Sequence, residues 1–181
     1  MPTLVAFLRA INVGGHTVKM DHLRKLFEEL GFSKVETFIA SGNVIFESAE
    51  EDTQALESRI EDHLRIALGY EVATFIRSAA ELAETANYEP FSQAELTEGA
   101  NLFVAFLKAA PTEQGTDDLM AFRTDIDDFR VHRREVYWLC RTSMHLSAFS
   151  GARLEKTLKM PATIRNSTTV KKLAAKYPAS K

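Results

Sequence analysis

The chain has 181 residues, 45% of them hydrophobic, with a formal net charge of −3, which is typical of a soluble globular protein with one sizeable core or two small ones. No apolar run approaches the roughly 18 residues that a membrane helix needs, and the start at Met1 lacks the basic region and cleavage site of a secretory signal. Cys140 is the only cysteine, which excludes an internal disulfide and favours a reducing compartment. We therefore expect a cytoplasmic protein.

The small net charge conceals a strong asymmetry along the chain. Residues 1–128 hold 10 Lys+Arg and 23 Asp+Glu, whereas residues 129–181 hold 12 Lys+Arg and only Glu135 and Glu155. Two interpretations stay open, and both can hold together. The two parts attract each other across a domain interface, or the second part presents a basic surface to an anionic ligand.

The first half predicts six elements in the order strand, helix, strand, strand, helix, strand. A continuous apolar run is typical of a buried strand, stripes spaced by three and four predict helices, and capping-box patterns at Ser48 and Ser78 predict helix starts. The order is that of a ferredoxin-like unit. The six segments are a strand at 4–8, a helix at 20–30, strands at 35–40 and 43–47, a helix that ends before Gly69, and a strand at 71–77. A short third helix is expected to follow from residue 79.

The second half repeats this order and adds one helix. We expect strand 102–108, a helix from Pro111 to Met120, a hairpin of 129–133 with 136–141 around Arg134-Glu135, a helix 148–159 capped by Ser147, strand 162–165 and helix 168–176. No repeat is visible at the level of sequence. The fold class is therefore α+β, with two tandem βαββαβ (ferredoxin-like) subdomains, antiparallel sheets and an extra C-terminal helix. We predict subdomains at 1–86 and 102–181 and a linker at 87–101, which is rich in breakers and acids.

Two groups of polar residues are candidates for a binding site. In the first unit, right-handed crossovers bring the end of the first strand beside the turn between strands two and three. This rim offers a guanidinium, amides, a hydroxyl and free loop N–H groups, a plausible cradle for an anion or polar ligand, although glycines for turns and amides that satisfy the loop backbone explain it equally. Its residues are Arg9, Asn12, Gly14, Gly15, Ser41 and Asn43.

The second group surrounds the start of the last helix. The first N–H groups of a helix lack intrahelical partners and attract anions, and hydroxyl residues after Asn166 are typical of a helix cap. We expect Arg165 and Lys171 to supply charge, and Asn166 and Thr169 to orient the ligand. The sequence does not tell whether this group and the Arg9 loop share one cleft.

Three motifs in this order resemble a known family, the largely bacterial set catalogued as domain of unknown function 1697. The resemblance spans essentially the whole chain and implies two α+β subdomains, the first ferredoxin-like, but it implies no activity. Ala10 stands where the family usually has Gly, and Ser167 where it usually has Trp, so any ligand stacking by that Trp is absent here. The motifs are Leu8–Gly15, Ser41–Phe46 and Thr163–Asn166 with Thr169.

Patterns for other chemistry are weak. There is no phosphate loop, no dinucleotide fingerprint and no His-Glu-x-x-His, and the five histidines are scattered, so we expect neither a metal nor a cofactor. Cys140 alternates with Val136 and Trp138 on one strand face, which predicts a packed core thiol rather than a nucleophile.

The leading hypothesis is a cytoplasmic protein that binds a phosphate- or carboxylate-bearing small molecule. The first alternative is nucleic-acid binding by the basic half. The second is a metal-independent enzyme acting on a phosphorylated substrate, for which the sequence identifies no general base. We expect no membrane partner, and the sequence gives no oligomeric state. The cations available for nucleic acid are Arg130, Arg133, Arg134, Arg165, Lys171 and Lys172.

Overall fold

A computed structural model describes residues 1–9, 11, 17–39 and 42–180 of the chain. It divides into two compact units, one of Met1–Glu84 with Leu173–Lys181 and the other of Thr85–Lys172. The first unit thus includes the end of the chain, which the sequence prediction had placed in the second subdomain. Residues 88–100, predicted as part of a linker, form neither helix nor strand.

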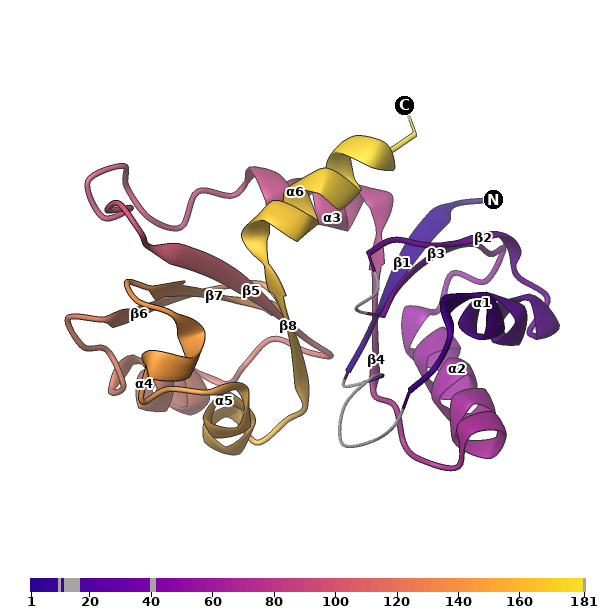
Figure 1. Ribbon diagram of the computed structural model, residues 1–181, viewed down its shortest axis with the longest axis horizontal. Helices are drawn as coiled ribbons and strands as arrows, with labels where there is room; N and C mark the ends of the chain where they lie inside the picture. The colour runs from indigo at the N-terminus through magenta and orange to yellow at the C-terminus, as the bar shows by residue number, and fades with distance from the viewer. Residues whose placement is uncertain (10, 12–16, 40–41, 181) are drawn as a thin grey trace. The chain divides into compact units, whose positions relative to one another are not determined.

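The first unit has the predicted order β-α-β-β-α-β, and its four strands form an antiparallel sheet in the order β2-β3-β1-β4. Figure 1 shows the six elements of this order in indigo to magenta. Helix α3 (Ala79–Asn87) follows the last strand. The six elements are β1 (Thr3–Leu8), α1 (Met20–Glu29), β2 (Ser33–Thr37), β3 (Asn43–Glu47), α2 (Thr53–Leu68) and β4 (Thr74–Ser78).

The second unit repeats the arrangement, with its strands in the order β6-β7-β5-β8. The fold class predicted from the sequence is therefore confirmed, including the extra C-terminal helix. The elements are β5 (Asn101–Leu107), α4 (Glu113–Met120), β6 (Asp127–His132), β7 (Glu135–Cys140), the short 3-10 helix η1 (Met144–Leu146), α5 (Gly151–Leu158), β8 (Ala162–Asn166) and α6 (Ser167–Lys176).

Each unit buries one face of its sheet against two helices. In the first, α1 and α2 pack Leu23 and Leu56 onto Ala6 of β1. In the second, α4 and α5 pack on the sheet face that carries Trp138 and Cys140, and α6 begins on the other side of that sheet (Figure 1). The prediction that Cys140 is a core thiol is confirmed, because its side chain is fully buried.

Several helix starts differ from the sequence prediction. The box at Ser48 does not open α2, because Asp52 caps this helix by accepting hydrogen bonds from the N–H groups of Gln54 and Ala55. The Ser48 hydroxyl instead accepts from the N–H of Glu50. The second box is confirmed, since Ser78 N–H donates to Glu81 Oε2 at 2.9 Å and Glu81 N–H donates to Ser78 Oγ at 3.1 Å.

Three boundaries in the second unit shift by one to three residues. Ser150, not Ser147, caps α5, so Gly151 is the first residue of this helix. Pro111 precedes the cap of α4, which is Thr112. The β6–β7 turn contains Arg133 with a left-handed φ of 55°, and Glu135 already belongs to β7.

The sequence predicts no extended repeat, but the two units share two short identical stretches at equivalent positions. Val5-Ala6-Phe7-Leu8 of β1 recurs as Val104-Ala105-Phe106-Leu107 of β5. Ile76-Arg77 near the end of β4 recurs as Ile164-Arg165 near the end of β8. The pairing agrees, because Arg77 lies opposite Val5 and Arg165 lies opposite Val104.

None of the described helices is long and apolar enough to cross a membrane. Among the described residues, no group of three or more His, Cys, Asp or Glu side chains is arranged to hold a metal ion.

Candidate functional site

The rim predicted in the first unit is only partly described. Asn43 is buried, and its side-chain N–H donates to the carbonyl of Phe38 at 2.9 Å, so this amide is already bonded to the backbone that follows β2. Arg9 is exposed just after β1, and its backbone N–H donates to the carbonyl of Ala73 at 2.9 Å. Four predicted site residues lie outside the described residues: Asn12, Gly14, Gly15 and Ser41.

Arg165 is a buried residue of β8, an edge strand of the second sheet. Its side chain is 8% exposed, and Nη1 donates to the hydroxyl of Thr163 at 2.8 Å and to the carbonyl of Ile164 at 3.0 Å. Burial lowers the pKa of Arg165 to about 10, so the guanidinium remains charged at neutral pH. The sequence predicts this charge at an open helix start, whereas the side chain is covered by the protein.

The start of α6 is capped by the chain itself. Asn166 Oδ1 accepts a hydrogen bond from the N–H of Thr168 at 2.9 Å, so an amide fills the role that the sequence suggested for hydroxyl residues. Thr169 is half-buried and Lys171 is exposed. Of the four residues predicted here, Lys171 is therefore the one whose charged group faces solvent.

A hollow of about 550 Å³, counted with the solvent open to it, lies within the second unit. Lys171 lines it together with Ser167, the residue that follows Asn166. The wall comes from the end of α3, the segment after it, β5, β7 and the first turns of α6. The lining residues are Thr85, Ala86, Tyr88, Glu89, Pro90, Phe91, Gln93, Leu96, Leu102, Val104, Tyr137, Ser167, Val170 and Lys171.

The floor of this hollow belongs to a row of side chains that crosses the whole sheet. Arg130 is paired with Tyr137, Tyr137 with Val104, and Val104 with Arg165. Residues paired in this way point to the same face of a sheet. The floor residues Tyr137 and Val104 therefore lie between two arginines, one on each edge strand.

Two tyrosine rings, those of Tyr88 and Tyr137, contribute to the lining of the hollow. Tyr88 stacks on His132 with ring centroids 4.1 Å apart and an interplanar angle of 7°, and its centroid is 5.0 Å from that of Tyr137. The Tyr137 hydroxyl donates to the carbonyl of Thr85 at 3.4 Å. Burial, and next the carboxylate of Glu135, raise the pKa of Tyr137 far above its ordinary value, so the phenol stays neutral.

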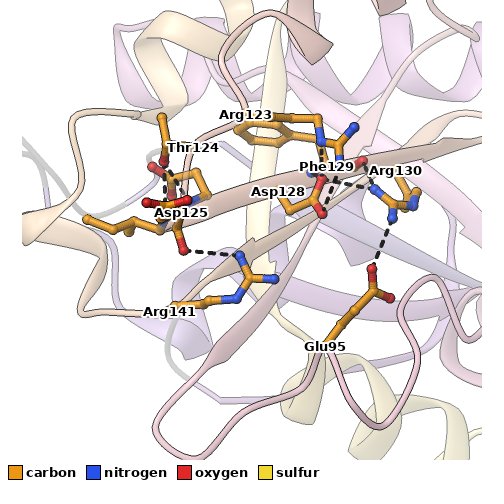
Figure 2. Close-up of polar contacts among 10 residues, drawn as sticks. Glu95, Arg123, Thr124, Asp125, Asp128, Phe129, Arg130 and Arg141 are labelled. Atoms are coloured by element: carbon orange, nitrogen blue, oxygen red, sulfur yellow. Dashed lines mark hydrogen bonds and ion pairs between the residues drawn. The ribbon is translucent and has the colours of Figure 1, made fainter.

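A chain of ion pairs runs along β6, which is an edge strand (Figure 2). Asp128 is buried between two arginines: its Oδ1 lies 2.7 Å from Nε of Arg123 and 2.9 Å from Nη1 of Arg130. Arg130 also reaches Glu95, with Nη2 and Oε1 3.3 Å apart. This cluster was not among the residues predicted from the sequence. The Asp-x-Arg spacing of Asp128 and Arg130, which places both on one strand face, is the signal that could have indicated it.

The cations proposed for nucleic-acid contact differ in how far they are exposed to solvent. Arg130 is engaged in ion pairs and Arg165 is buried. Arg133, Lys171 and Lys172 are exposed, and Arg134 is half-buried.

The thiol of Cys140 is unsuited to nucleophilic chemistry. It donates to the carbonyl of Thr142 at 3.2 Å, and burial raises its pKa. Attack by cysteine requires the thiolate, which a raised pKa disfavours.

Comparison with known proteins gives a fold and a family. No curated protein matches the chain. The solved structure of a conserved bacterial protein from Streptococcus pneumoniae is similar, with a TM-score of 0.69 and 21% sequence identity over 96% of this chain and 97% of that one. At this identity the likeness shows the fold alone. The family expected from the motifs is confirmed, since its model matches residues 1–137: the chain belongs to the family described as protein of unknown function (DUF1697).

Proposed function

We propose that the second unit binds a small anionic molecule, phosphate- or carboxylate-bearing, that also carries a flat apolar group. The observation that carries this proposal is a hollow lined mostly by apolar and aromatic side chains, with the amine of Lys171 in its lining. Ligand sites are typically concave and mostly apolar, with a few polar groups that fix orientation. This hollow has that composition.

The apolar part of the ligand is expected to contact the rings and branched side chains. Phe91 and Tyr88 come from one wall, and Leu102, Val104 and Val170 from the floor and the opposite helix. Flat groups stack on aromatic rings, with centroids between about 4.5 and 7 Å apart in protein examples. An aryl or heteroaryl group therefore suits this lining better than a sugar or a polyol.

The anionic part is expected to meet Lys171. This amine forms no ion pair with the described residues, and it lies one turn after the start of α6, where the helix dipole favours negative charge. Arg165, paired with Val104 on the adjacent edge strand, adds positive potential at one side of the floor. Glu89 also lines the hollow and opposes these charges.

The test is a titration with phenyl phosphate, which joins an aryl group to a dianion, alongside inorganic phosphate and phenol as its separate halves. Adenosine monophosphate extends the panel to a larger ring. We expect phenyl phosphate to raise the melting temperature more than either half, because bound ligand stabilises the folded state. Calorimetry then gives the dissociation constants.

The chain supplies a matched pair of variants. Lys171→Ala removes the amine that lines the hollow, whereas Lys172→Ala removes the next, equally exposed amine, which does not line it. A hydrogen bond to a charged group contributes about 1.5–3 kcal/mol, so Lys171→Ala is expected to weaken phenyl phosphate binding at least about tenfold. Equal losses in the two variants, or no binding to wild type at millimolar concentration, contradict the proposal.

Two further measurements on the same protein test the alternatives, nucleic-acid binding and a metal-independent enzyme. Binding to a polynucleotide that falls steeply and linearly with salt on a log–log plot, through several neutralised phosphates, favours a nucleic-acid surface. Release of inorganic phosphate from phenyl phosphate favours a metal-independent enzyme.

A further inference from the structure

We propose that Arg130 is a latch that holds residues 88–100 against the second sheet and thereby keeps one wall of the hollow in place. The contacts that form the latch lie entirely within the second unit. Its consequence for ligand access rests on the proposed function.

The held segment, residues 88–100, joins α3 to β5 and has no regular secondary structure. It nevertheless supplies Tyr88, Glu89, Pro90, Phe91, Gln93 and Leu96 to the lining of the hollow. All of its residues are described, and Phe91 alone among them is buried. A segment with so little buried surface belongs to the least stable part of a fold, so the few contacts that it makes decide where it lies.

Arg130 contacts this segment at two points. Its guanidinium carbon lies 4.8 Å from the centroid of the Phe91 ring, within the range of a cation–π contact. Its Nη2 lies 3.3 Å from Oε1 of Glu95. One guanidinium therefore holds two residues four positions apart, and one of them is the single buried residue of the segment.

The other side of the guanidinium is fixed to β6. Nη1 donates to Oδ1 of Asp128 and to the carbonyl of Phe129, both at 2.9 Å. Figure 2 shows Asp128 between Arg123 and Arg130, with Glu95 reaching Arg130 from a separate loop. Because the sheet orients the guanidinium, less side-chain freedom is lost when the segment docks.

Glu95 is also oriented before it meets Arg130. Ser92 N–H donates to Glu95 Oε2 at 2.7 Å, and Glu95 N–H donates to Ser92 Oγ at 3.3 Å, a reciprocal pattern like that of a capping box. The hydrogen bond from the Ser92 backbone, with help from the Ser92 hydroxyl and the charge of Arg130, lowers the pKa of Glu95. The carboxylate is therefore charged at neutral pH.

Arg123 provides the control. It pairs with the same carboxylate, Asp128, and carries the same charge, but its side chain makes no hydrogen bond, ion pair or ring contact with residues 88–100. A general effect of removing a cation from this edge appears in both Arg123→Ala and Arg130→Ala. An effect of the latch appears only in the second.

The experiment is hydrogen–deuterium exchange on the full chain without ligand. A partly exposed ion pair and a cation–π contact together correspond to about tenfold in a local opening equilibrium. We therefore expect exchange of the amides of residues 92–96 to be about tenfold faster in Arg130→Ala and within twofold of wild type in Arg123→Ala. Arg130→Lys, which keeps the charge but loses the planar fork, is expected to lie between them.

The amides of β7 serve as the internal reference. Faster exchange there as well would mean that the whole unit is less stable, and that outcome overturns the latch, as does equal exchange in the two alanine variants. In a second arm, phenyl phosphate binding is expected to weaken in Arg130→Ala and not in Arg123→Ala. If wild type binds no phenyl phosphate but the exchange result holds, the proposed function fails and the latch stands. If wild type binds phenyl phosphate but exchange in Arg130→Ala is unchanged, the latch fails and the proposed function stands.

Discussion

Replacement of Gly42 by alanine is expected to destabilise the first unit by more than the backbone strain of a left-handed alanine, because the added Cβ also meets neighbouring atoms. Gly42 has a φ of +79°, and a Cβ built on it lies 2.9 Å from Cγ2 of Ile11, 3.2 Å from Cβ of Leu8 and 3.3 Å from the Leu8 carbonyl oxygen. Leu8 cannot easily give way, because its N–H donates to the carbonyl of Gly42 at 2.8 Å and it ends a strand paired on both sides.

Two terms contribute to the expected loss. An alanine in the left-handed region costs about 1–2 kcal/mol, and an added methyl group in a packed region costs about 1–3 kcal/mol. Gly31→Ala measures the first term alone, because Gly31 has a similar φ of +87° and no neighbouring atom within 4 Å of its Cβ position. We therefore expect Gly42→Ala to lose about 2–5 kcal/mol of unfolding free energy and Gly31→Ala only the first term, about 1–2 kcal/mol.

The assay is urea unfolding followed by far-UV circular dichroism. The only tryptophan, Trp138, lies in the second unit, so its fluorescence reports on that unit in parallel. Equal destabilisation by the two substitutions would refute the steric reasoning, because the contacts with Ile11 and Leu8 would then contribute nothing.

Three further predictions use simpler measurements. Glu57 is buried and its Oε1 accepts the N–H of Ile76 at 2.9 Å, so Glu57→Ala should cost about 1–3 kcal/mol in urea unfolding, whereas Glu57→Gln should keep most of this stability. Cys140 should react with a thiol reagent only after unfolding, since burial raises its pKa; rapid labelling of the native protein would contradict this. Glu89→Gln should strengthen phenyl phosphate binding a few-fold, because removal of a carboxylate from the lining relieves about 1 kcal/mol or less of repulsion, and unchanged affinity would place the anion elsewhere.

The fold was predictable because its signals are local and repeated. Apolar runs such as Val5–Leu8 predict buried strands, and stripes such as Leu56, Ile60 and Leu64 predict the helix that covers them. Right-handed crossovers then leave few topologies for this order of elements. The observed strand order agrees, with β3 between β2 and β1.

Helix starts were less predictable, as two similar patterns show. Ser48 and Ser78 are each followed three positions later by glutamate, yet only Ser78 opens a helix. The difference lies in the neighbours of Ser48. Asp52 offers a carboxylate that accepts two backbone N–H groups, and it begins the helix just before the apolar stripe at Leu56. A local capping pattern therefore does not set the helix start where a stronger cap lies a few residues further on.

The site was the least predictable part, since burial depends on elements far apart in the chain. The sequence places Arg165 at a strand end, but it does not tell that the side chain is covered. It likewise does not tell that Arg130 meets Glu95, 35 positions away, through a loop without periodicity. Of the predicted residues in this unit, Lys171 lines the hollow because it stands on a helix whose position the fold fixes.

Comparison of the two units with each other indicates which residues distinguish the proposed site. Arg77 and Arg165 occupy the same place, and each donates from Nη1 to the carbonyl of the preceding isoleucine, so a buried strand-end arginine is common to both units and does not single out one. The helices that follow diverge. At the start of α3 the carboxylate of Glu81 accepts the N–H of Ser78, the residue before the helix. The position equivalent to Glu81 in α6 is Thr169, and Lys171 stands where α3 has Ala83. An anion is repelled by the first arrangement and attracted by the second. The specificity for anions should therefore follow the helix start and not the arginine, which is why Lys171→Ala is the decisive variant.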